Sequence, residues 1–486
     1  MTGSSSSAQG TSTLDRFFHI TERGSTVATE VRAGLVTFFA MAYIIILNPL
    51  IIGTTEDHTG HALGIPQVAA ATALAAGMMT IAFGLIARYP FGIATGLGIN
   101  TLVAVTLVSG EGLTWPEAMG LVVIDGILIV LLAISGFRVA VFNAIPRELK
   151  AAMGVGIGLF IALIGLVDAK MVRRGGTPLE LGLGGSLQGW PVLVFLFGLF
   201  LMVVLHVRKV RGAILIGIAS ATVLAIIIDA VTHLGPYNDE TMPGPDNLTG
   251  WSLSEPRLDG FPVDVPSLST LGHFSLLGSV HKVGIVSVIL LVFSLLLADF
   301  FDTMGTMVAI GAEGDLLDEH GNPPKTREIL VVDSLAAIAG GVGGVSSNTS
   351  YVESAAGVGE GARTGLASVV TGCMFALSMF FAPLVKMVPY EAATPALVVV
   401  GFLMMMQVTD IDWKSPEIAL PAFLTIIMMP FSYSITNGIG AGFVSYLVIE
   451  VAQGRARRIH PLMWVACAMF VVYFTLAPIK AILGVS

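Results

Sequence analysis

Long apolar stretches with almost no charge recur along the whole chain and restrict it to a membrane. Of its 486 residues, 55% are hydrophobic and only 12% are charged, whereas a soluble domain carries about 25% charged residues. Stretches such as 68–89 and 115–134 reach the roughly 20 residues that an apolar helix needs to cross the hydrocarbon core. The abundant glycines and methionines suit close packing between helices better than β-barrel strands. The sequence therefore predicts an all-α polytopic membrane protein.

The apolar stretches divide the chain into two halves. They number about seven in each half, and a further stretch, 462–479, follows the second set. An odd number of spans between two copies makes the second copy enter the membrane upside down, which is the inverted-repeat architecture. A short match of Pro146-Arg147-Glu148 to Pro389-Tyr390-Glu391 supports the division. About 14 transmembrane helices in two inverted 7-helix repeats are predicted.

The distribution of turn-forming and charged residues predicts the domain boundaries. We expect a disordered N-terminal tail (1–13), a first seven-helix repeat (14–233), an external acidic loop (234–280), a second seven-helix repeat (281–452) and a C-terminal segment with a possible extra helix (453–486). Basic residues that precede the first apolar stretch place the N-terminus in the cytoplasm. No basic cluster is dense enough to indicate nucleic-acid binding, and neither Cys373 nor Cys467 indicates a metal site.

Two carboxylates lie one helical turn apart at the end of an apolar stretch. Asp299 and Asp302 follow the run 285–298, which carries no charge. An ionisable group at membrane depth costs about 2.5–3.5 kcal/mol on insertion scales, so its default interpretation is functional. Residues three apart share a helix face, so both side chains can project into one cavity. The alternative is that Asp302 lies beyond the apolar core and is solvated.

Two Gly-rich segments predict broken helices. The run 340–348 is expected not to stay helical, Ser/Asn/Thr residues are expected to cap the next helix, and Glu353 lies in its first turns. The first half has a counterpart in 92–101, which contains Gly98 and Asn100. Irregular backbone at membrane depth is tolerated where it is buried in protein or lines a cavity. Alternatively, these glycines serve helix packing alone.

The predicted site is acidic, and this limits its ligands. Clustered carboxylates favour a neutral or cationic ligand over an anion, and they suit coupling to protons. Two carboxylates and an amide match a flat heterocycle with N–H and C=O groups. The residues alone indicate a proton- or cation-coupled transporter of a polar small molecule. Four other acids in apolar segments are assigned structural roles: Asp125, Asp229, Asp333 and Glu450.

Three motifs resemble a known family. The opening Leu14-Asp15-Arg16-Phe17-Phe18 and the segments 298–306 and 347–358 resemble AzgA-like purine permeases. These belong to the nucleobase:cation symporter-2, or nucleobase/ascorbate transporter, superfamily. The resemblance runs from Leu14 through nearly the whole chain.

The resemblance implies a core domain (helices one to four and eight to eleven), a gate domain, and short extended segments in helices 3 and 10. It implies a substrate site formed by Asp299, Glu353, Asn100, Asn348 and Gly98, with proton coupling by Asp302, Asp299 and Glu353. Leu102 stands where relatives commonly carry an aromatic residue.

On this resemblance the chain imports purine nucleobases (hypoxanthine, guanine and/or adenine) by proton symport through an elevator-type mechanism. It needs no cofactor or metal, and sodium is an alternative coupling ion. Its expected location is a bacterial plasma membrane, and the wider superfamily implies a homodimer. The alternatives are an anion or other small-solute carrier of the same architecture, a channel, and a membrane-embedded enzyme, for which no nucleophile–base pair appears.

Overall fold

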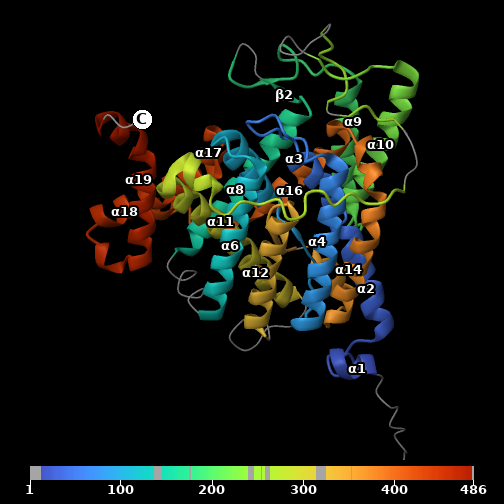
Figure 1. Ribbon diagram of the computed structural model, residues 1–486, viewed down its shortest axis with the longest axis horizontal. Coiled ribbons are helices and arrows are strands. Elements are labelled where there is room, and N and C mark those ends of the chain that lie inside the picture. Colours follow the sequence, from blue (N-terminus) through green and yellow to red (C-terminus); the bar gives the residue numbers. More distant parts are fainter. Residues whose placement is uncertain are drawn as a thin grey trace, which may run out of the picture.

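The protein is a bundle of helices with two very small sheets (Figure 1). The computed structural model describes residues 13–135, 145–173, 177–238, 246–252, 254–257, 263–313, 325–351 and 353–483. The predicted disordered tail, 1–13, lies outside these residues except for Thr13, which begins the first helix.

The elements of the first half alternate long helices with short or broken ones. They are α1 (Thr13–Phe18), α2 (Val27–Met41), α3 (Ile44–Ile52), α4 (Ile65–Ile86), β1 (Ile93–Thr95), α5 (Leu97–Thr101), the π-helix η1 (Leu102–Gly110), α6 (Trp115–Ser135), α8 (Arg147–Asp168), β2 (Val172–Arg173), β3 (Glu180–Leu181), α9 (Trp190–Val207) and α10 (Ala213–Thr232). Strands β2 and β3 pair with each other near the end of α8.

The second half has a similar order. Its elements are α11 (Gly278–Glu313), α12 (Thr326–Gly343), β4 (Asn348–Ser350), α13 (Ser354–Gly359), α14 (Gly365–Ser378), η2 (Met379–Met387), α15 (Tyr390–Ala393), α16 (Pro395–Met405), η3 (Met406–Asp410), α17 (Pro416–Ser432), α18 (Ile435–Ala452), η4 (Ala456–Arg458) and α19 (Pro461–Leu483). Helices α18 and α19 lie on the side opposite α2 and α14 (Figure 1), where α18 packs on α17. The extra C-terminal helix expected in 453–486 is thus present as α19, and whether it spans the membrane stays a prediction.

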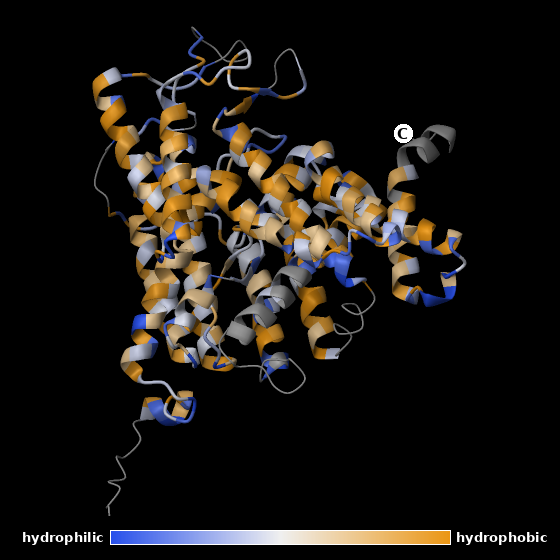
Figure 2. Cartoon of the chain, turned by 180° about the vertical axis from the view of Figure 1, so that it is seen from behind, coloured by the Kyte–Doolittle hydropathy of each residue, from blue (hydrophilic) through white to orange (hydrophobic). Residues whose placement is uncertain are grey.

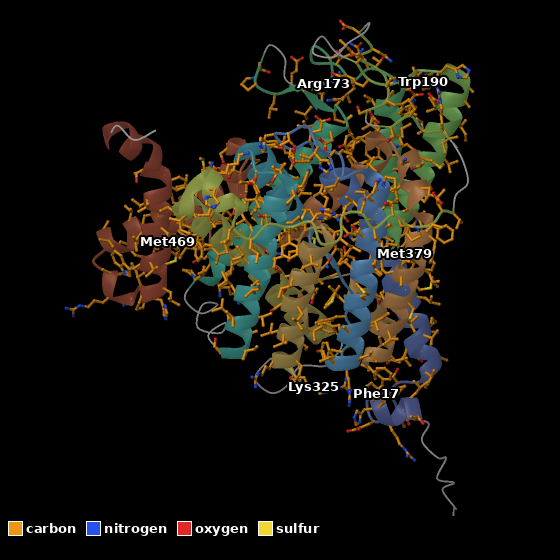
Figure 3. The ribbon with its side chains drawn as sticks, viewed as in Figure 1. Phe17, Arg173, Trp190, Lys325, Met379 and Met469 are labelled. Carbon is orange, nitrogen blue, oxygen red and sulfur yellow. The ribbon has the colours of Figure 1, made fainter. Side chains whose placement is uncertain are left out.

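The helices have the lengths and surfaces of membrane spans. Among the described residues, 10 helices are long and apolar enough to cross a membrane. Apolar residues cover the sides of the bundle, and hydrophilic residues gather toward its ends (Figure 2). Arg173 and Trp190 lie at one end, whereas Lys325 and Phe17 lie at the other (Figure 3). The chain is a mostly helical, multi-pass membrane protein, as the sequence predicted.

In the described part of the chain, several of the apolar stretches that were counted among the predicted spans fold into shorter pieces. Segments 97–110 and 416–432 are apolar but too short to count as straight spans. The helical part after β4 has only six residues. Short helices of this kind are typical of broken spans that line a cavity.

The glycine run before β4 remains helical for longer than the sequence predicted. Helix α12 continues to Gly343, and the break comes at Gly344, whose φ is 68°. That left-handed conformation suits glycine because it has no Cβ. Within the helix, Gly341 allows close packing, since an added Cβ would lie 2.8 Å from the Val123 side chain on α6. The prediction that 340–343 leave the helix is therefore wrong.

The two Gly-rich segments meet at the centre of the bundle. β1 and β4 pair in antiparallel fashion, with Ile93 opposite Ser350 and Thr95 opposite Asn348. Every residue of both strands is buried. This pairing confirms the short extended segments that were predicted for helices 3 and 10. It also joins the two halves of the chain.

A second junction between the halves is the contact of α4 with α14, which uses paired glycines. A Cβ added at Gly84 would overlap the carbonyl oxygen of Gly365, and one added at Gly77 would lie 2.9 Å from that of Gly372. Small residues let helix backbones approach closely in membranes.

We expect Gly84→Ala to lower the free energy of unfolding by about 1–3 kcal/mol, because the methyl group overpacks this contact. Gly359→Ala is the control, since a Cβ there meets nothing within 4 Å. The measurement is the midpoint of thermal unfolding of the detergent-solubilised protein. Equal midpoints for the two variants would contradict this account of the contact.

The connection between α10 and α11 is anchored to the helices at Trp251. The indole Nε1 of Trp251 donates a hydrogen bond of 2.9 Å to Asp229 of α10. The adjacent Ser252 N–H donates to Glu391 of α15 at 3.1 Å. This connection runs from residue 233, after the end of α10, to residue 277, before the start of α11. These limits are close to those predicted for the external acidic loop, 234–280. These bonds fit the structural role predicted for Asp229.

Candidate functional site

Glu353 follows β4 and lies at the N-cap position of α13. Its side chain is half-buried. The hydroxyl of Tyr43 donates a hydrogen bond of 2.5 Å to its Oε1. Tyr43 is 1% exposed and lies where α2 ends and α3 begins. The sequence predicted a Ser/Asn/Thr cap with Glu353 inside the first turns of the helix. This prediction is wrong, because residues 348–350 form strand β4 and helix α13 starts only at Ser354.

Asp299 lies on α11 beside the start of β4. It is 1% exposed, and its Oδ2 accepts a hydrogen bond of 2.5 Å from the hydroxyl of Ser347. α11 contacts β4, α5 and α13, so Asp299 belongs to the same part of the bundle as the strand crossing. Asp302 is also on α11, but its side chain lies outside the described residues.

Asn100 supplies a buried amide on the other side of the crossing. It lies in α5, which begins two residues after β1. It is 0% exposed, and among the described residues neither its Oδ1 nor its Nδ2 has a hydrogen-bond partner. Leaving a buried polar group unpaired costs about 1–3 kcal/mol. α5 is therefore suited to a polar ligand that would pair with this amide.

Asn348 and Gly98 are the remaining predicted site residues. Asn348 pairs with Thr95 across the strands, and its Nδ2 donates to the carbonyl oxygen of Ala336 at 3.1 Å, while its buried Oδ1 has no hydrogen bond in the described part of the chain. A Cβ added at Gly98 would lie 2.9 Å from the Ile157 side chain of α8. The structure thus brings together four predicted residues around the strand crossing (Asn100, Asn348, Glu353 and Asp299) and places Gly98 on the same short helix as Asn100.

Several residues of this region were not assigned to the site from the sequence. Asp333 of α12 accepts hydrogen bonds from Thr303 at 2.6 Å and from the Ser350 hydroxyl at 2.9 Å. The hydroxyl of Tyr351 donates to the carbonyl oxygen of Thr95 at 2.5 Å. The sequence singled out Asp333 because an acid is unusual in an apolar stretch. A tyrosine in such a stretch is ordinary, so Tyr351 was not singled out. Asp333 supports β4, in agreement with its predicted structural role.

Two carboxylates of this region each accept a hydrogen bond from a hydroxyl group. Asp299 accepts from a serine and Glu353 from a tyrosine. Bonds to ionised acceptors are short and about twice as strong as bonds between neutral groups. Such a set of acceptors suits a ligand that brings N–H donors and disfavours an anion.

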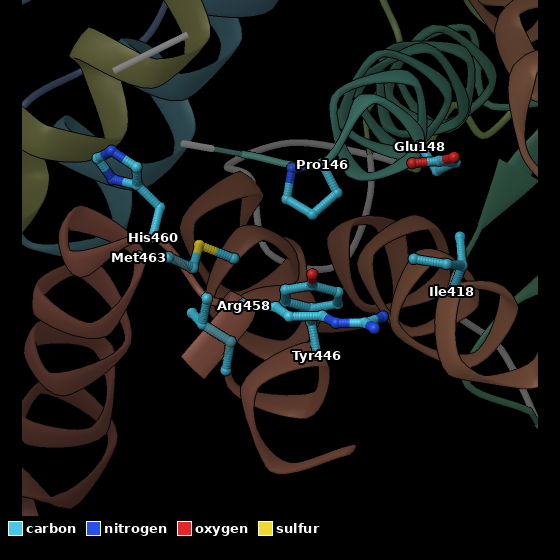
Figure 4. A pocket seen from close by; sticks show the side chains of 8 residues that line it. Pro146, Glu148, Ile418, Tyr446, Arg458, His460 and Met463 are labelled. Carbon is cyan, nitrogen blue, oxygen red and sulfur yellow. The ribbon is translucent and has the colours of Figure 1, made fainter. Parts of the chain in front are cut away.

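In the described ranges no group of three or more His, Cys, Asp or Glu residues could hold a metal ion. A cavity of about 440 Å³ lies between α8, α17, α18 and α19 and is lined by residues that include Glu148, Tyr446 and His460 (Figure 4). None of the predicted site residues lines this cavity.

Comparison with known proteins identifies the family. The family model described as "Permease family" (Xan_ur_permease) matches residues 28–441. This range includes the paired strands β1 and β4 and all the predicted site residues. The chain belongs to this family. It is the nucleobase:cation symporter-2 family, so the chain is a permease and not an enzyme.

Curated relatives of this permease cover almost its whole length. It is 38% identical to the guanine/hypoxanthine permease PbuG of Bacillus subtilis, over 95% of this chain and 99% of that protein. It is 35% identical to the adenine permease AdeP of Escherichia coli, over 95% of this chain and 96% of that protein. The predicted family is thereby confirmed.

A solved structure shares the fold of the permease. The transmembrane domain of the cyanobacterial bicarbonate transporter BicA superposes with a TM-score of 0.56, over 87% of this chain and 96% of that domain. The identity is 12%. At this identity the likeness extends to the fold alone.

Proposed function

We propose that this permease imports purine nucleobases (hypoxanthine, guanine and/or adenine) by proton symport. The observation that carries the proposal is the fully buried amide of Asn100, which has no hydrogen-bond partner among the described residues. It lies on α5, which contacts α11, and Asp299 of α11 accepts a hydrogen bond from a hydroxyl group. A purine base offers ring N–H donors for carboxylates and both donors and acceptors for an amide. The names of the relatives, a guanine/hypoxanthine permease and an adenine permease, support this substrate class.

Each predicted site residue has a role in this proposal. Glu353 and Asp299 accept the ring N–H groups, and Asn100 orients the base through its amide. Asn348 and Gly98 complete the substrate-binding surface. Asp302, Asp299 and Glu353 take part in coupling, because a carboxylate that changes protonation makes ligand binding depend on the proton gradient. Sodium is the alternative coupling ion, and no cofactor is needed.

We further propose that the bundle consists of two inverted seven-helix repeats (14–233 and 281–452), divided into core and gate domains that move like an elevator. The contacts support this: α4 packs on α14, and α12 packs on α6. In the inverted-repeat scheme α12 corresponds to α4 and α14 to α6, so one pair is the image of the other. The pairing of β1 with β4 lies between them.

The proposed location is a bacterial plasma membrane with the N-terminus in the cytoplasm, as the basic residues before the first span indicate. A homodimer is the proposed assembly. With the N-terminus in the cytoplasm, the connection 233–277 would lie on the external side of the membrane.

The test is uptake of labelled hypoxanthine by a bacterial cell that lacks its own purine transporters. We expect saturable accumulation that unlabelled purine bases inhibit and that a proton uncoupler abolishes. Uptake that persists with the uncoupler would exclude proton symport. Flux that rises linearly without saturation would indicate a channel, and transport of bicarbonate or sulfate without purines would indicate an anion carrier.

A further inference from the structure

Glu360 is a carboxylate that two arginines share. It follows α13 directly, and its side chain is 12% exposed. Its Oε2 lies 3.1 Å from Nε of Arg32 on α2, and its Oε1 pairs with the guanidinium of Arg211 in the connection between α9 and α10. Arg32 also donates a hydrogen bond of 3.3 Å to the backbone carbonyl oxygen of Glu360. Each oxygen of the carboxylate thus has an arginine of its own.

The two ion pairs differ in the parts of the bundle that they join. α13 packs closely on α2, since a Cβ added at Gly357 would lie 2.8 Å from the carbonyl oxygen of Ala33. These helices belong to the tenth and first spans and so to the proposed core domain. α9 and α10 are the sixth and seventh spans and belong to the proposed gate domain. The pair with Arg32 therefore stays within the core, whereas the pair with Arg211 crosses from the core to the gate.

The gate also touches α2 directly beside Arg211. The next residue, Gly212, is the N-cap of α10. A Cβ added there would lie 3.1 Å from the carbonyl oxygen of Phe39 and 3.7 Å from its Cβ, and Phe39 is on α2. Gly212 brings no side chain into this contact, so the two surfaces do not interlock.

The ion pair at this contact can break and form again. Arg211 is 53% exposed, and water competes with an ion pair at such a position, so the pair is weak. Glu360, by contrast, is held in place by Arg32 of the same domain. A movement of the core past the gate would separate Arg211 from Glu360 and leave the pair with Arg32 intact.

We propose that Glu360 and Arg211 form an ionic latch, which holds the core and gate domains together in this conformation and opens in each transport cycle. This inference rests on the proposed movement of the two domains. Neither residue belongs to the predicted substrate site, so the latch sets how fast the permease changes conformation and leaves the affinity for the base unchanged. Arg32 is one of the basic residues at the start of the first span, which places the latch on the proposed cytoplasmic side.

The first experiment joins core and gate with a disulfide beside the latch, in a permease whose native thiols are removed by Cys373→Ser and Cys467→Ser. Phe39→Cys with Gly212→Cys would place two Cβ atoms 3.7 Å apart, within the roughly 3.5–4.5 Å of disulfides. We expect oxidation to lower hypoxanthine uptake at least about tenfold and a reductant to restore it, because the change of conformation is blocked. The oxidised permease should still gain thermal stability with hypoxanthine, since its substrate site is unchanged.

The matched control is a disulfide within the core. Ala75→Cys with Gly343→Cys joins α4 to α12, where the Cβ atoms would lie 4.0 Å apart. We expect its oxidation to change uptake by less than about twofold, since both helices move together. A disulfide between positions 39 and 212 that leaves uptake intact, or two thiols there that do not couple, would overturn the inference while purine transport stands.

A second experiment tests the charges of the latch and needs no substrate. The rate of disulfide formation between positions 39 and 212 reports how much of the time α2 and α10 are in contact. Glu360→Gln should slow this reaction at least about fivefold, because the charge that holds Arg211 is lost and the closed population falls. Loss of a nearby negative charge would by itself favour the thiolate and speed the reaction. A slower rate therefore has to come from separation of the two domains.

Arg32→Gln is the control for the charges, since it removes an arginine from the same carboxylate without acting between the domains. We expect it to change the rate by less than about twofold. Arg211→Gln combined with Glu360→Gln should slow the reaction no more than Glu360→Gln alone, because two partners of one interaction are not additive. An unchanged rate in Glu360→Gln would overturn the latch. Absence of purine uptake by the wild type would overturn the proposed function, and the rates of disulfide formation would still test the latch.

Discussion

Replacing Glu353 with glutamine is expected to reduce purine uptake by at least about tenfold, and up to about a hundredfold, in a permease that still reaches the membrane. A hydrogen bond to a charged group contributes about 1.5–3 kcal/mol, and each 1.4 kcal/mol is about tenfold in affinity. Glutamine keeps the shape of the side chain and an oxygen that can accept from Tyr43. It presents an NH₂ group where the carboxylate accepts, and it cannot bind a transported proton.

The measurement is the initial rate of labelled hypoxanthine uptake as a function of pH, normalised to the amount of permease in the membrane. Glu22→Gln is the control, because it makes the same chemical change on an exposed carboxylate whose hydrogen-bond partner is His19. That variant should transport at the wild-type rate. Full uptake by Glu353→Gln with an unchanged pH dependence would refute the central role of Glu353.

Asn100→Leu is expected to abolish specific purine uptake and, unlike most core substitutions, to leave the empty permease as stable as the wild type or more stable. The amide is 0% exposed, and both of its polar atoms lack partners among the described residues. An apolar side chain of similar volume removes the desolvation cost without breaking a bond. The ligand loses the group that orients it.

Thermal unfolding with and without hypoxanthine measures both effects. The wild type should gain stability with the ligand, because a ligand that binds only the folded state stabilises it, whereas Asn100→Leu should gain none. Asn48→Leu is the matched control, since Asn48 is also fully buried but its Nδ2 donates to Thr72 at 2.8 Å and to the Val345 carbonyl oxygen at 3.2 Å. It should unfold at a lower temperature. An equal loss of stability in both variants would mean that the Asn100 amide is structural.

The sequence indicated candidate site residues at positions where a residue type conflicts with its apolar surroundings. Asp299 and Glu353 are costly in apolar stretches, and glycines around Asn100 interrupt a helix pattern, so each produces a signal along the chain. Tyr43 gives no such signal, because a tyrosine in an apolar stretch is ordinary. Its contact with Glu353 depends on how α13 packs on α2, which lies far from it in sequence.

The errors at the broken helices have a similar cause, because they also depend on contacts between segments that lie far apart in the sequence. The glycines in 340–343 stay helical, and Gly341 among them packs closely against Val123 of α6, whereas Gly344 takes the left-handed conformation that ends α12. Local composition does not distinguish these two uses of glycine. The extended segments were predicted, but the register of Thr95 opposite Asn348 is a long-range pairing that only the structure reveals.

The most direct test of purine symport is uptake by the purified permease in proteoliposomes, with an imposed pH gradient as the only energy source. The account predicts that hypoxanthine accumulates above its external concentration when the outside is acidic, that accumulation stops when an ionophore collapses the gradient, and that Glu353→Gln does not accumulate it. Equal hypoxanthine flux with and without the gradient, or no hypoxanthine flux at all, would contradict it.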